Sequence, residues 1–469
     1  MTPAIVWFRN DLRLRDHPAL QAALKSGMAP LPVYIHAPHE EGAWKPGAAS
    51  DAWRHRSLAA LDADLRSRGS RLHVFAGDSL QTLQAIAAAT GAAAVFWHRR
   101  HEPCVDERDA AIRRTLHRGG LRAEAHNGSL LFEPWQVATR NDAPFRVFTP
   151  FWKAALAAWP RHTLNEAPPS LPAFERLPGE ALLGHLGLQP DPRWDTGFWD
   201  AWRPGEQGAA DALGTFAQRA LHDYRDGRDR PDQPLTSGLS PHLHFGEIAP
   251  WRVVAELASI EPADQRFAYV RELGWREFAH HVLHHFPHTT DANFNPRFDD
   301  FDWAEPDPDT LRAWKFGRTG VPIVDAGMRQ LTATGWIHNR VRMVVASYLT
   351  KHLRVHWHHG ARWFWDRLVD ADLANNTLGW QWVAGTGVDA APYFRVFNPV
   401  LQARRFDPDG AYIAQWVPEL RGVPAAARHA PWEVPRALGD IGRYPPQPVV
   451  DLAEGRRGAL DALARLKPI

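Results

Sequence analysis

The segment DADLANNTLGWQW, residues 370–382, places two carboxylates, three side-chain amides and two indole rings within about four helical turns. An ordinary core segment would not carry so many polar groups. Two carboxylates so close together can hold a metal ion, but a hard cation would need further oxygen ligands at loop spacing. They can also act as an acid–base pair on a sugar, or pair with a cation and accept hydrogen bonds from a bound heterocycle.

Outward from this segment, two other stretches group polar, aromatic and apolar side chains on a helical face. Glu272, Trp275 and Arg276 stand at positions i, i+3 and i+4, so a helix directs all three to one side. The same spacing recurs in a second stretch, at Asn339, Arg342 and Met343. One such helix alone would indicate a surface ion pair beside a core tryptophan. Two of them, together with residues 370–382, favour a binding site.

The first part of the chain alternates short apolar runs with helical patterns. The runs that we expect to form strands are residues 4–8, 31–35, 72–75, 94–97 and 121–125. One intervening helix has clear start and stop residues, an N-cap near Asp78–Ser79 and a C′ glycine at Gly91. This alternation predicts a parallel, doubly wound sheet. The first strand continues into Arg9–Arg13 without a glycine-rich turn, so we do not expect a nicotinamide-dinucleotide site.

The chain has 469 residues, which is more than one hydrophobic core usually supports. We expect an α/β domain over residues 1–130, a Pro-rich connector over residues 131–204 and a mostly helical domain over residues 205–469. The expected fold class is therefore α/β followed by α. A Rossmann-like sheet forms the N-terminal domain, and the helical domain contains residues 370–382.

Composition excludes several classes of protein. Hydrophobic residues make up 45% and charged residues 23%, and no apolar run approaches the length of a membrane span. The N-terminus enters an apolar strand without a signal peptide, so we expect a cytoplasmic protein. The single cysteine, Cys104, excludes a disulfide framework and a Cys-based metal centre. A net charge of +1 means that binding to nucleic acid would require a local basic face.

Six blocks of the sequence resemble, in order, signature segments of the photolyase/cryptochrome family. They are VWFRNDLRLRDH (6–17), TSGLSPHLHFGEI (236–248), WREF (275–278), GVPIVDAGMRQL (320–331), GWIHNRVRM (335–343) and WQWVAGTGVDAAPYFRVFNP (380–399). The similarity spans nearly the whole chain. It implies the two-domain fold expected above and an FAD cofactor in the helical domain.

The resemblance implies that hydroxyl and backbone N–H groups hold the FAD phosphates. The residues in or beside this pocket would be Tyr224, Thr236, Ser237, Gly238, Leu239, Ser240, Arg276 and Asn339. Arg342 would pair with Asp370 beside the flavin. Asp372 would meet the edge of the flavin ring, and Asn376 would face the ring nitrogen whose protonation state changes on reduction.

The resemblance also implies a pocket for a flipped pyrimidine dimer of UV-damaged DNA. Trp275 and Trp382 would form its walls. Glu272 and Asn339 would hydrogen-bond the base edges, and Met343 would pack against the dimer. The residues expected around the mouth of the pocket, in contact with DNA phosphates, are Arg228, Arg340, Arg395 and Gln402. Such contacts position DNA without reading its sequence.

The implied reaction is driven by light. Photoexcited, reduced FAD would donate an electron to the dimer, the cyclobutane ring would split, and the electron would return to the flavin. The catalytic residues would be Glu272, Asn339, Met343 and Asn376. A separate path would reduce oxidised flavin through indole rings, and its members would be Trp380, Trp357 and Trp303.

Three activities of this family are open: repair of cyclobutane dimers, repair of (6-4) photoproducts, and blue-light signalling by a cryptochrome. An amide at Asn376 accompanies photolyases, whereas plant cryptochromes tend to have an acid there and animal ones a cysteine. A (6-4) enzyme would have a histidine pair near positions 339 and 343, where this chain has Asn339 and Met343. Cryptochromes usually carry a C-terminal extension that this sequence does not show. We therefore expect a monomeric lyase that repairs cyclobutane dimers.

A second, antenna chromophore is not determined by the sequence. One photolyase branch binds folate through an Asn–Glu pair, whereas the matching stretch here is HEPCV, residues 101–105. Residues 42–58 resemble a branch related to plant cryptochromes, so an antenna would be a folate held differently, a deazaflavin, or absent.

Two clusters of histidine offer the i, i+4 spacing of zinc ligands but lack the His-Glu-x-x-His arrangement, so we expect packing histidines and no metal. They are His280, His281, His284 and His285, and then His356, His358 and His359.

Overall fold

A computed structural model describes residues 1–390, 394–434 and 442–466, so residues 391–393 of the block 380–399 lie outside the described residues. Five parallel strands form one sheet in the order β3-β2-β1-β4-β5. They are β1 (Pro3–Phe8), β2 (Ala29–His36), β3 (His73–Ala76), β4 (Ala94–His98) and β5 (Arg122–His126). All five expected strands are confirmed, each to within two residues at either end.

Helices cover both faces of the sheet. They are α1 (Pro18–Lys25), α2 (Ala48–Arg66), α3 (Ser79–Thr90) and α4 (Pro103–Arg118). Val6 of β1 packs in one core with α1 and α2, while its neighbour Trp7 packs in a second core with α3 and α4, since successive side chains of a strand point to opposite faces. The predicted caps of α3 are confirmed: the side chain of Asp78 accepts from Gln81 N at 2.8 Å, and Gly91 ends the helix at φ 68°.

The segment between the sheet and the long helices contributes to the cores of both. It contains the helices α5 (Phe148–Ala157) and α6 (Phe198–Ala201). Phe148 and Phe151 pack among the later helices, whereas Leu171 and Leu188 pack with α1 and α2. This Pro-rich stretch therefore lies against both parts of the molecule instead of hanging free between them.

From residue 206 onward the described chain is helical. The α-helices are α7 (Glu206–Arg219), α8 (Tyr224–Gly227), α9 (Ser240–His244), α10 (Pro250–Leu257), α11 (Ala263–His285), α12 (Pro308–Lys315), α13 (Pro322–Thr334), α14 (Asn339–Ser347), α15 (Trp357–Arg367), α16 (Leu373–Ala384), α17 (Pro399–Phe406), α18 (Ala411–Trp416), α19 (Ala425–Arg428) and α20 (Leu452–Arg465). Short 3-10 turns lie at η1 (Pro38–Trp44), η2 (Leu183–His185), η3 (Leu221–Asp223), η4 (Pro287–Thr290), η5 (Pro296–Asp300), η7 (Pro418–Leu420) and η8 (Pro431–Glu433), and a π-helical turn at η6 (Tyr348–His352).

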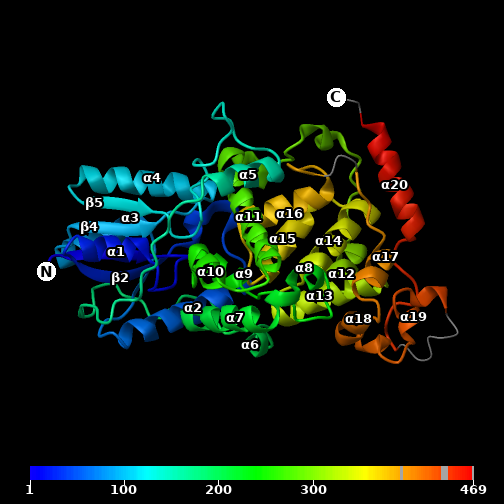
Figure 1. Ribbon diagram of the computed structural model, residues 1–469, viewed down its shortest axis with the longest axis horizontal. Coiled ribbons are helices and arrows are strands. Elements are labelled where there is room, and N and C mark those ends of the chain that lie inside the picture. Colours follow the sequence, from blue (N-terminus) through cyan, green and yellow to red (C-terminus); the bar gives the residue numbers. More distant parts are fainter. Residues whose placement is uncertain (391–393, 435–441, 467–469) are drawn as a thin grey trace.

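The two parts of the molecule meet along α2 and α15. Figure 1 shows the sheet at one end and helices α17 to α20 at the other, with α11 and α16 between them. Gly47, just before α2, lies so close to the carbonyl oxygen of Trp365 that an added Cβ would be 2.2 Å from it. Arg362 stacks over the ring of Trp44 at 3.5 Å. Among the described residues, no helix is both long and apolar enough to cross a membrane.

Candidate functional site

Three helices carry the residue groups that the sequence singles out. The first group, at 272, 275 and 276, lies on α11; the second, at 339, 342 and 343, lies on α14; and residues 373–382 form most of α16. Helix α16 packs against α11, α14 and α15, so groups that lie about 30 to 100 positions apart in the sequence come together in space. The predicted clustering of these stretches is therefore present.

The cation–carboxylate pair expected beside the flavin is formed. Arg342 donates to both oxygens of Asp370 at 3.1 and 2.8 Å, and the Asp370 side chain is only 4% exposed. The Nε of Arg342 also donates to the carbonyl of Ile337 at 2.8 Å. Hydrogen bonds on two sides therefore fix the position and orientation of the Arg342 guanidinium.

Asp372 is the N-cap of α16 and the centre of a polar cluster. One oxygen accepts from the backbone N–H of Asn375 at 2.9 Å, and the other lies 3.5 Å from both His244 and His280. Burial opposes its ionisation, but the charge of His280 and the hydrogen bonds from both imidazoles outweigh burial and hold the pKa of Asp372 well below its usual range. Asp372 is thus an ionised acceptor in a largely enclosed place.

Neither histidine partner of Asp372 was assigned a role from the sequence. The sequence predicts a packing role for His280, and His244 lies only within the block 236–248. Arg276 and His280 are four positions apart on α11 and line the same pocket as Asp372, so the i, i+4 spacing contained a signal for His280. His244 comes from a different helix, and its approach to Asp372 depends on tertiary packing.

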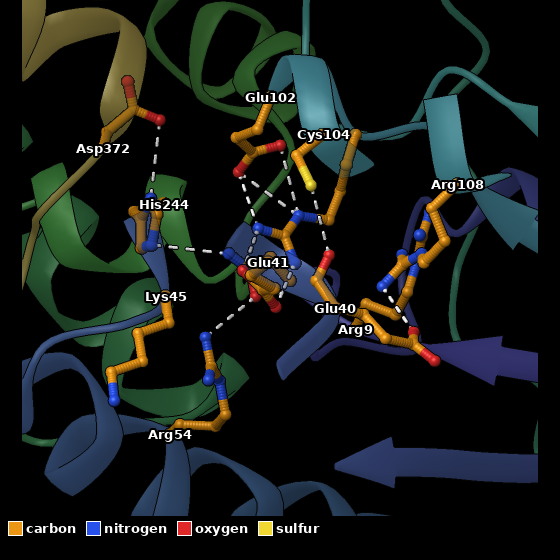
Figure 2. A network of polar contacts seen from close by, with 12 residues as sticks. Arg9, Glu40, Glu41, Lys45, Arg54, Glu102, Cys104, Arg108, His244 and Asp372 are labelled. Atoms are coloured by element: carbon orange, nitrogen blue, oxygen red, sulfur yellow. Dashed lines mark hydrogen bonds and ion pairs between the residues drawn. The ribbon is translucent and has the colours of Figure 1, made fainter. Parts of the chain in front are cut away.

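The polar cluster continues into the sheet domain (Figure 2). The second ring nitrogen of His244 lies 3.4 Å from the amide of Asn10, whose oxygen accepts from Arg54 at 3.5 Å. Arg276 reaches across as well and donates to the carbonyl of Ser129 at 2.7 Å. The edge of the site near Asp372 is therefore built by both parts of the molecule.

Two tyrosines support residues 236–240, the turn that is expected to face the FAD phosphates. Gly238 has φ 66°, a conformation that favours glycine, and the Ser237 hydroxyl accepts from Leu239 N at 3.3 Å and from the Tyr269 hydroxyl at 3.1 Å. The rings of Tyr269 and Tyr224 meet edge to face at 5.2 Å. The other residues of the turn are Thr236, which is half-buried, and Ser240, whose hydroxyl accepts from Trp336 at 3.3 Å.

Asn376 and Trp380 occupy the same face of α16, one turn apart, and both contact α15. The amide of Asn376 donates to the carbonyl of Ala361 at 3.1 Å. Trp380 is 3% exposed and lies against Gly360, where an added Cβ would be 2.0 Å from the indole. Glycine at position 360 is what lets the indole approach α15 so closely.

Two of the three expected electron carriers, Trp357 and Trp303, are connected by ring contacts through His356. Trp357 lies on α15, three residues before Gly360, and is fully buried, with its indole N–H donating to Asn293 at 2.9 Å. The ring of His356 lies 5.6 Å from Trp357 and 5.0 Å from Trp303, which is half-buried. The described ring contacts of Trp380 are with Trp314 at 6.2 Å and Phe364 at 5.0 Å.

The residues expected to contact the lesion lie on the outer side of α11, α14 and α16. Trp275 stacks on Phe148 at 3.7 Å, and Trp382 and Met343 are half-buried at the margin of the core. Asn339 is exposed at the first turn of α14.

The residues expected to contact phosphate lie at the surface beside this margin. Arg340 pairs with Asp229 at 2.6 Å and lies over the ring of Phe406 at 4.3 Å. Arg228 pairs with Glu272. Arg395 is exposed, and Gln402 is half-buried on α17.

Comparison with known proteins agrees with this geometry. Residues 4–173 match the family model described as DNA photolyase, and residues 269–465 match the model of the FAD binding domain of DNA photolyase. The deoxyribodipyrimidine photo-lyase of Agrobacterium fabrum is 44% identical, over 99% of this chain and 98% of that protein. Cryptochrome-1 of Arabidopsis thaliana is 35% identical, over 99% of this chain and 70% of that protein.

A solved structure gives the same answer. The crystal structure of a bacterial class III photolyase from Agrobacterium tumefaciens has a TM-score of 0.94 at 43% identity, over 99% of this chain and 98% of that one. The chain belongs to the DNA photolyase family. The expected family, the α/β-plus-helical fold and the FAD cofactor of this photolyase-family protein are therefore confirmed.

The histidines of this photolyase-family protein mostly serve packing. His281 donates to the carbonyl of Pro134 at 2.9 Å and accepts from Phe145 N at 3.0 Å, which satisfies both ring nitrogens. His356 caps α15 by accepting from His358 N at 3.3 Å.

One cluster with metal-like spacing lies elsewhere, at Asp11, His17 and His98. The far nitrogens of both imidazoles accept backbone N–H groups, from Leu20 at 3.0 Å and Ala19 at 3.3 Å. Each near nitrogen therefore carries the proton and lies 3.1 Å from Asp11.

Proposed function

We propose that this chain repairs cyclobutane pyrimidine dimers in UV-damaged DNA, using light and reduced FAD. The observation that carries the proposal is α16, which combines an ionised Asp372, the amide of Asn376, the buried Trp380 and the half-exposed Trp382 within one short helix. A curated relative at 44% identity over nearly its full length carries the name deoxyribodipyrimidine photo-lyase, which supports the same activity.

The residues present fit FAD. The flavin ring has an imide N–H that needs an acceptor, and the ionised Asp372 would supply it. Arg342, oriented by Asp370, would place a cation beside the ring and balance the negative charge of the reduced form. Tyr224 and the turn 236–240 would hold the phosphates. When bound, photoexcited reduced FAD would supply the electron that splits the cyclobutane ring and would regain it afterwards.

The protein's own residues would orient the lesion and exclude water. Trp275 and Trp382 would stack on the flipped bases, which have lost most of their stacking in the duplex and so cost less to extrude. Glu272 would accept a base N–H, and Asn339 would bond to a base edge. Met343, half-buried beside them, would fill the apolar gap.

A cryptochrome-type photoreceptor and a (6-4) photolyase are the alternatives. The curated relatives include plant cryptochromes at 35% identity, which keeps the first alternative within the family. Asn376 favours a photolyase over a cryptochrome. Asn339 and Met343 favour cyclobutane-dimer repair, because a (6-4) enzyme would place a histidine pair near positions 339 and 343.

The test is direct. The purified protein should show a flavin spectrum, and after reduction and illumination it should restore thymines in an oligonucleotide with a single cyclobutane dimer. Survival of the dimer, with repair of a (6-4) lesion or of nothing, would contradict the proposal.

We also propose a place for an antenna chromophore, either a folate or a deazaflavin. Ligands of doubly wound sheets bind at the carboxyl ends of the strands where the strand order reverses, which here is between β1 and β4. A pocket at the carboxyl ends of β1 and the neighbouring β2 is lined by Trp7, Tyr34, Arg54 and Arg108, among others. Aromatic rings and arginines suit a planar ring system with an anionic tail. Extraction of the purified protein should release a second chromophore with its own absorption band.

We propose that the chain divides into an α/β domain (1–130), a connector (131–204) and a helical FAD- and DNA-binding domain (205–469). We further propose that the protein acts as a monomer in the cytoplasm and needs no metal ion. The lone, exposed cysteine suits a reducing compartment. Light scattering and metal analysis of the purified protein test these statements.

A further inference from the structure

Two adjacent residues after α8 tie that helix to two others. Arg228 forms an ion pair with Glu272 of α11, and Asp229 forms one with Arg340 of α14 at 2.6 Å. Both arginines are expected to contact DNA phosphate, yet in the free protein each is held by a carboxylate. When DNA binds, each arginine would therefore exchange its carboxylate for a DNA phosphate.

The two pairs differ in the second task of their carboxylates. Glu272 lies three positions before Trp275 on the same face of α11, so it borders the proposed lesion pocket. Asp229 lies outside the helices that line this pocket. The two pairs are buried to a similar extent: the side chains of Arg228 and Glu272 are 24% and 26% exposed, and those of Arg340 and Asp229 are 20% and 34% exposed. The place of Glu272 beside the lesion pocket is therefore what distinguishes them.

We propose that Glu272 withholds Arg228 from the DNA backbone until a flipped lesion base takes its place at the carboxylate. The inference rests on the proposed function, because it needs a pyrimidine whose imide N–H is free to donate to Glu272. In undamaged DNA that N–H is engaged in a base pair and stays within the stack. Arg228 is then a specificity-determining residue, although it touches no base.

The free energy of this exchange depends on the burial of the Arg228–Glu272 pair. If undamaged DNA attracted Arg228, Glu272 would be left without a partner and close to the negative phosphates, which would cancel most of the gain. A lesion base removes this penalty because it supplies a new donor to the carboxylate. Asp229 lies outside the lesion pocket, so a lesion base does not change its pairing with Arg340, and the phosphate contact of Arg340 is the same with damaged and undamaged DNA.

Salt dependence of DNA binding separates the two arginines. Each phosphate contact contributes about 0.9 to the slope of log affinity against log salt concentration. The experiment uses the flavin-loaded protein in the dark and two duplexes that differ only in one thymine dimer. Arg228→Met should lower the slope for the damaged duplex by about 0.9 and leave that for the undamaged duplex unchanged. Arg340→Met, the matched control, should lower both slopes equally.

A second background tests the role of the carboxylate. Glu272→Gln should raise the slope for undamaged DNA by about 0.9, and adding Arg228→Met should remove that rise. Flavin content checks that each variant folds, and Arg228→Gln replaces Arg228→Met if the latter loses flavin. Equal lowering of both slopes by Arg228→Met would overturn the inference. A wild-type protein that binds both duplexes equally would contradict the proposed function itself.

Discussion

Trp380 and Trp382 lie two residues apart on α16 but face different environments. Trp380 is 3% exposed, packs against Phe364 at 5.0 Å and lies on Gly360. Trp382 is half-buried at the margin of the same core. Side chains two positions apart on a helix point in nearly opposite directions. On the proposed function, one helix would serve an inner electron path and an outer lesion pocket, and we expect that each can be disturbed without the other.

The largest difference between the inner and outer sides of α16 is expected from Trp380→Phe. Phenylalanine preserves an aromatic ring in the core but is much harder to oxidise than indole. Illumination of the oxidised, flavin-loaded variant with an external reductant should therefore no longer reduce the flavin. Absorbance of oxidised flavin over time measures this, and an unchanged rate would remove Trp380 from the electron path.

The contact between α15 and α16 is the next target. Gly360→Ala would place a methyl group 2.0 Å from a buried indole, so we expect a loss of about 1–3 kcal/mol in the free energy of unfolding. Urea unfolding monitored by circular dichroism measures the change.

Gly379 of α16 supplies the matched control, because an added Cβ there has no neighbour within 4 Å. Gly379→Ala should be neutral or stabilising by up to about 1 kcal/mol, since alanine favours a helix more than glycine does. Equal effects of the two substitutions would show that the close approach of Trp380 to α15 is unimportant.

The outer side of α16 is tested by Trp382→Ala. Loss of one stacking surface should weaken binding of dimer-containing DNA by about 1–3 kcal/mol, with the flavin spectrum unchanged. Fluorescence anisotropy with damaged and undamaged duplexes measures the affinity. Loss of flavin instead would place this indole in the cofactor site.

The smallest effect concerns pH and the pair of His280 with Asp372. Burial opposes the charge on His280, but the Asp372 carboxylate outweighs burial and raises the pKa of His280. A raised pKa means that the stabilisation is complete below the ordinary histidine value of about 6.5 and is lost as pH rises through the folded value. His280→Gln should therefore cost about 2 kcal/mol at pH 6 and less at pH 9.

His284 is the control for this pH dependence. Burial lowers the pKa of His284, so the contribution of this histidine to folding does not decline as pH rises. The difference in the free energy of unfolding between wild type and His284→Gln should therefore not shrink between pH 6 and 9. Denaturant unfolding at several pH values compares the variants. A constant cost of His280→Gln would mean that the ion pair with Asp372 adds nothing.

The sequence predicted the fold well wherever the signal was local. The strands were visible because parallel strands buried on both faces read as short apolar runs, and α3 was bounded by Asp78 and Gly91. The pairing of Arg342 with Asp370 came from the family resemblance, and the structure forms it. The ligand roles of the remaining site residues stay predictions.

Contacts between elements far apart in the sequence were not predictable. His244 and His280 meet at Asp372 only after α9, α11 and α16 have packed, and Asn10 joins them from the other domain. The ion pair of Arg228 with Glu272 is of the same kind. No local periodicity contains these distances, since they depend on how helices pack.

The most direct test of the separation within α16 is repair by the prereduced Trp380→Phe variant. The flavin is reduced chemically, the protein is mixed with a single-dimer oligonucleotide in the dark, and light is then applied. The account predicts wild-type repair, because the inner path is not needed once the flavin is reduced. Failure of the flavin-loaded, DNA-binding variant to repair the dimer would contradict it.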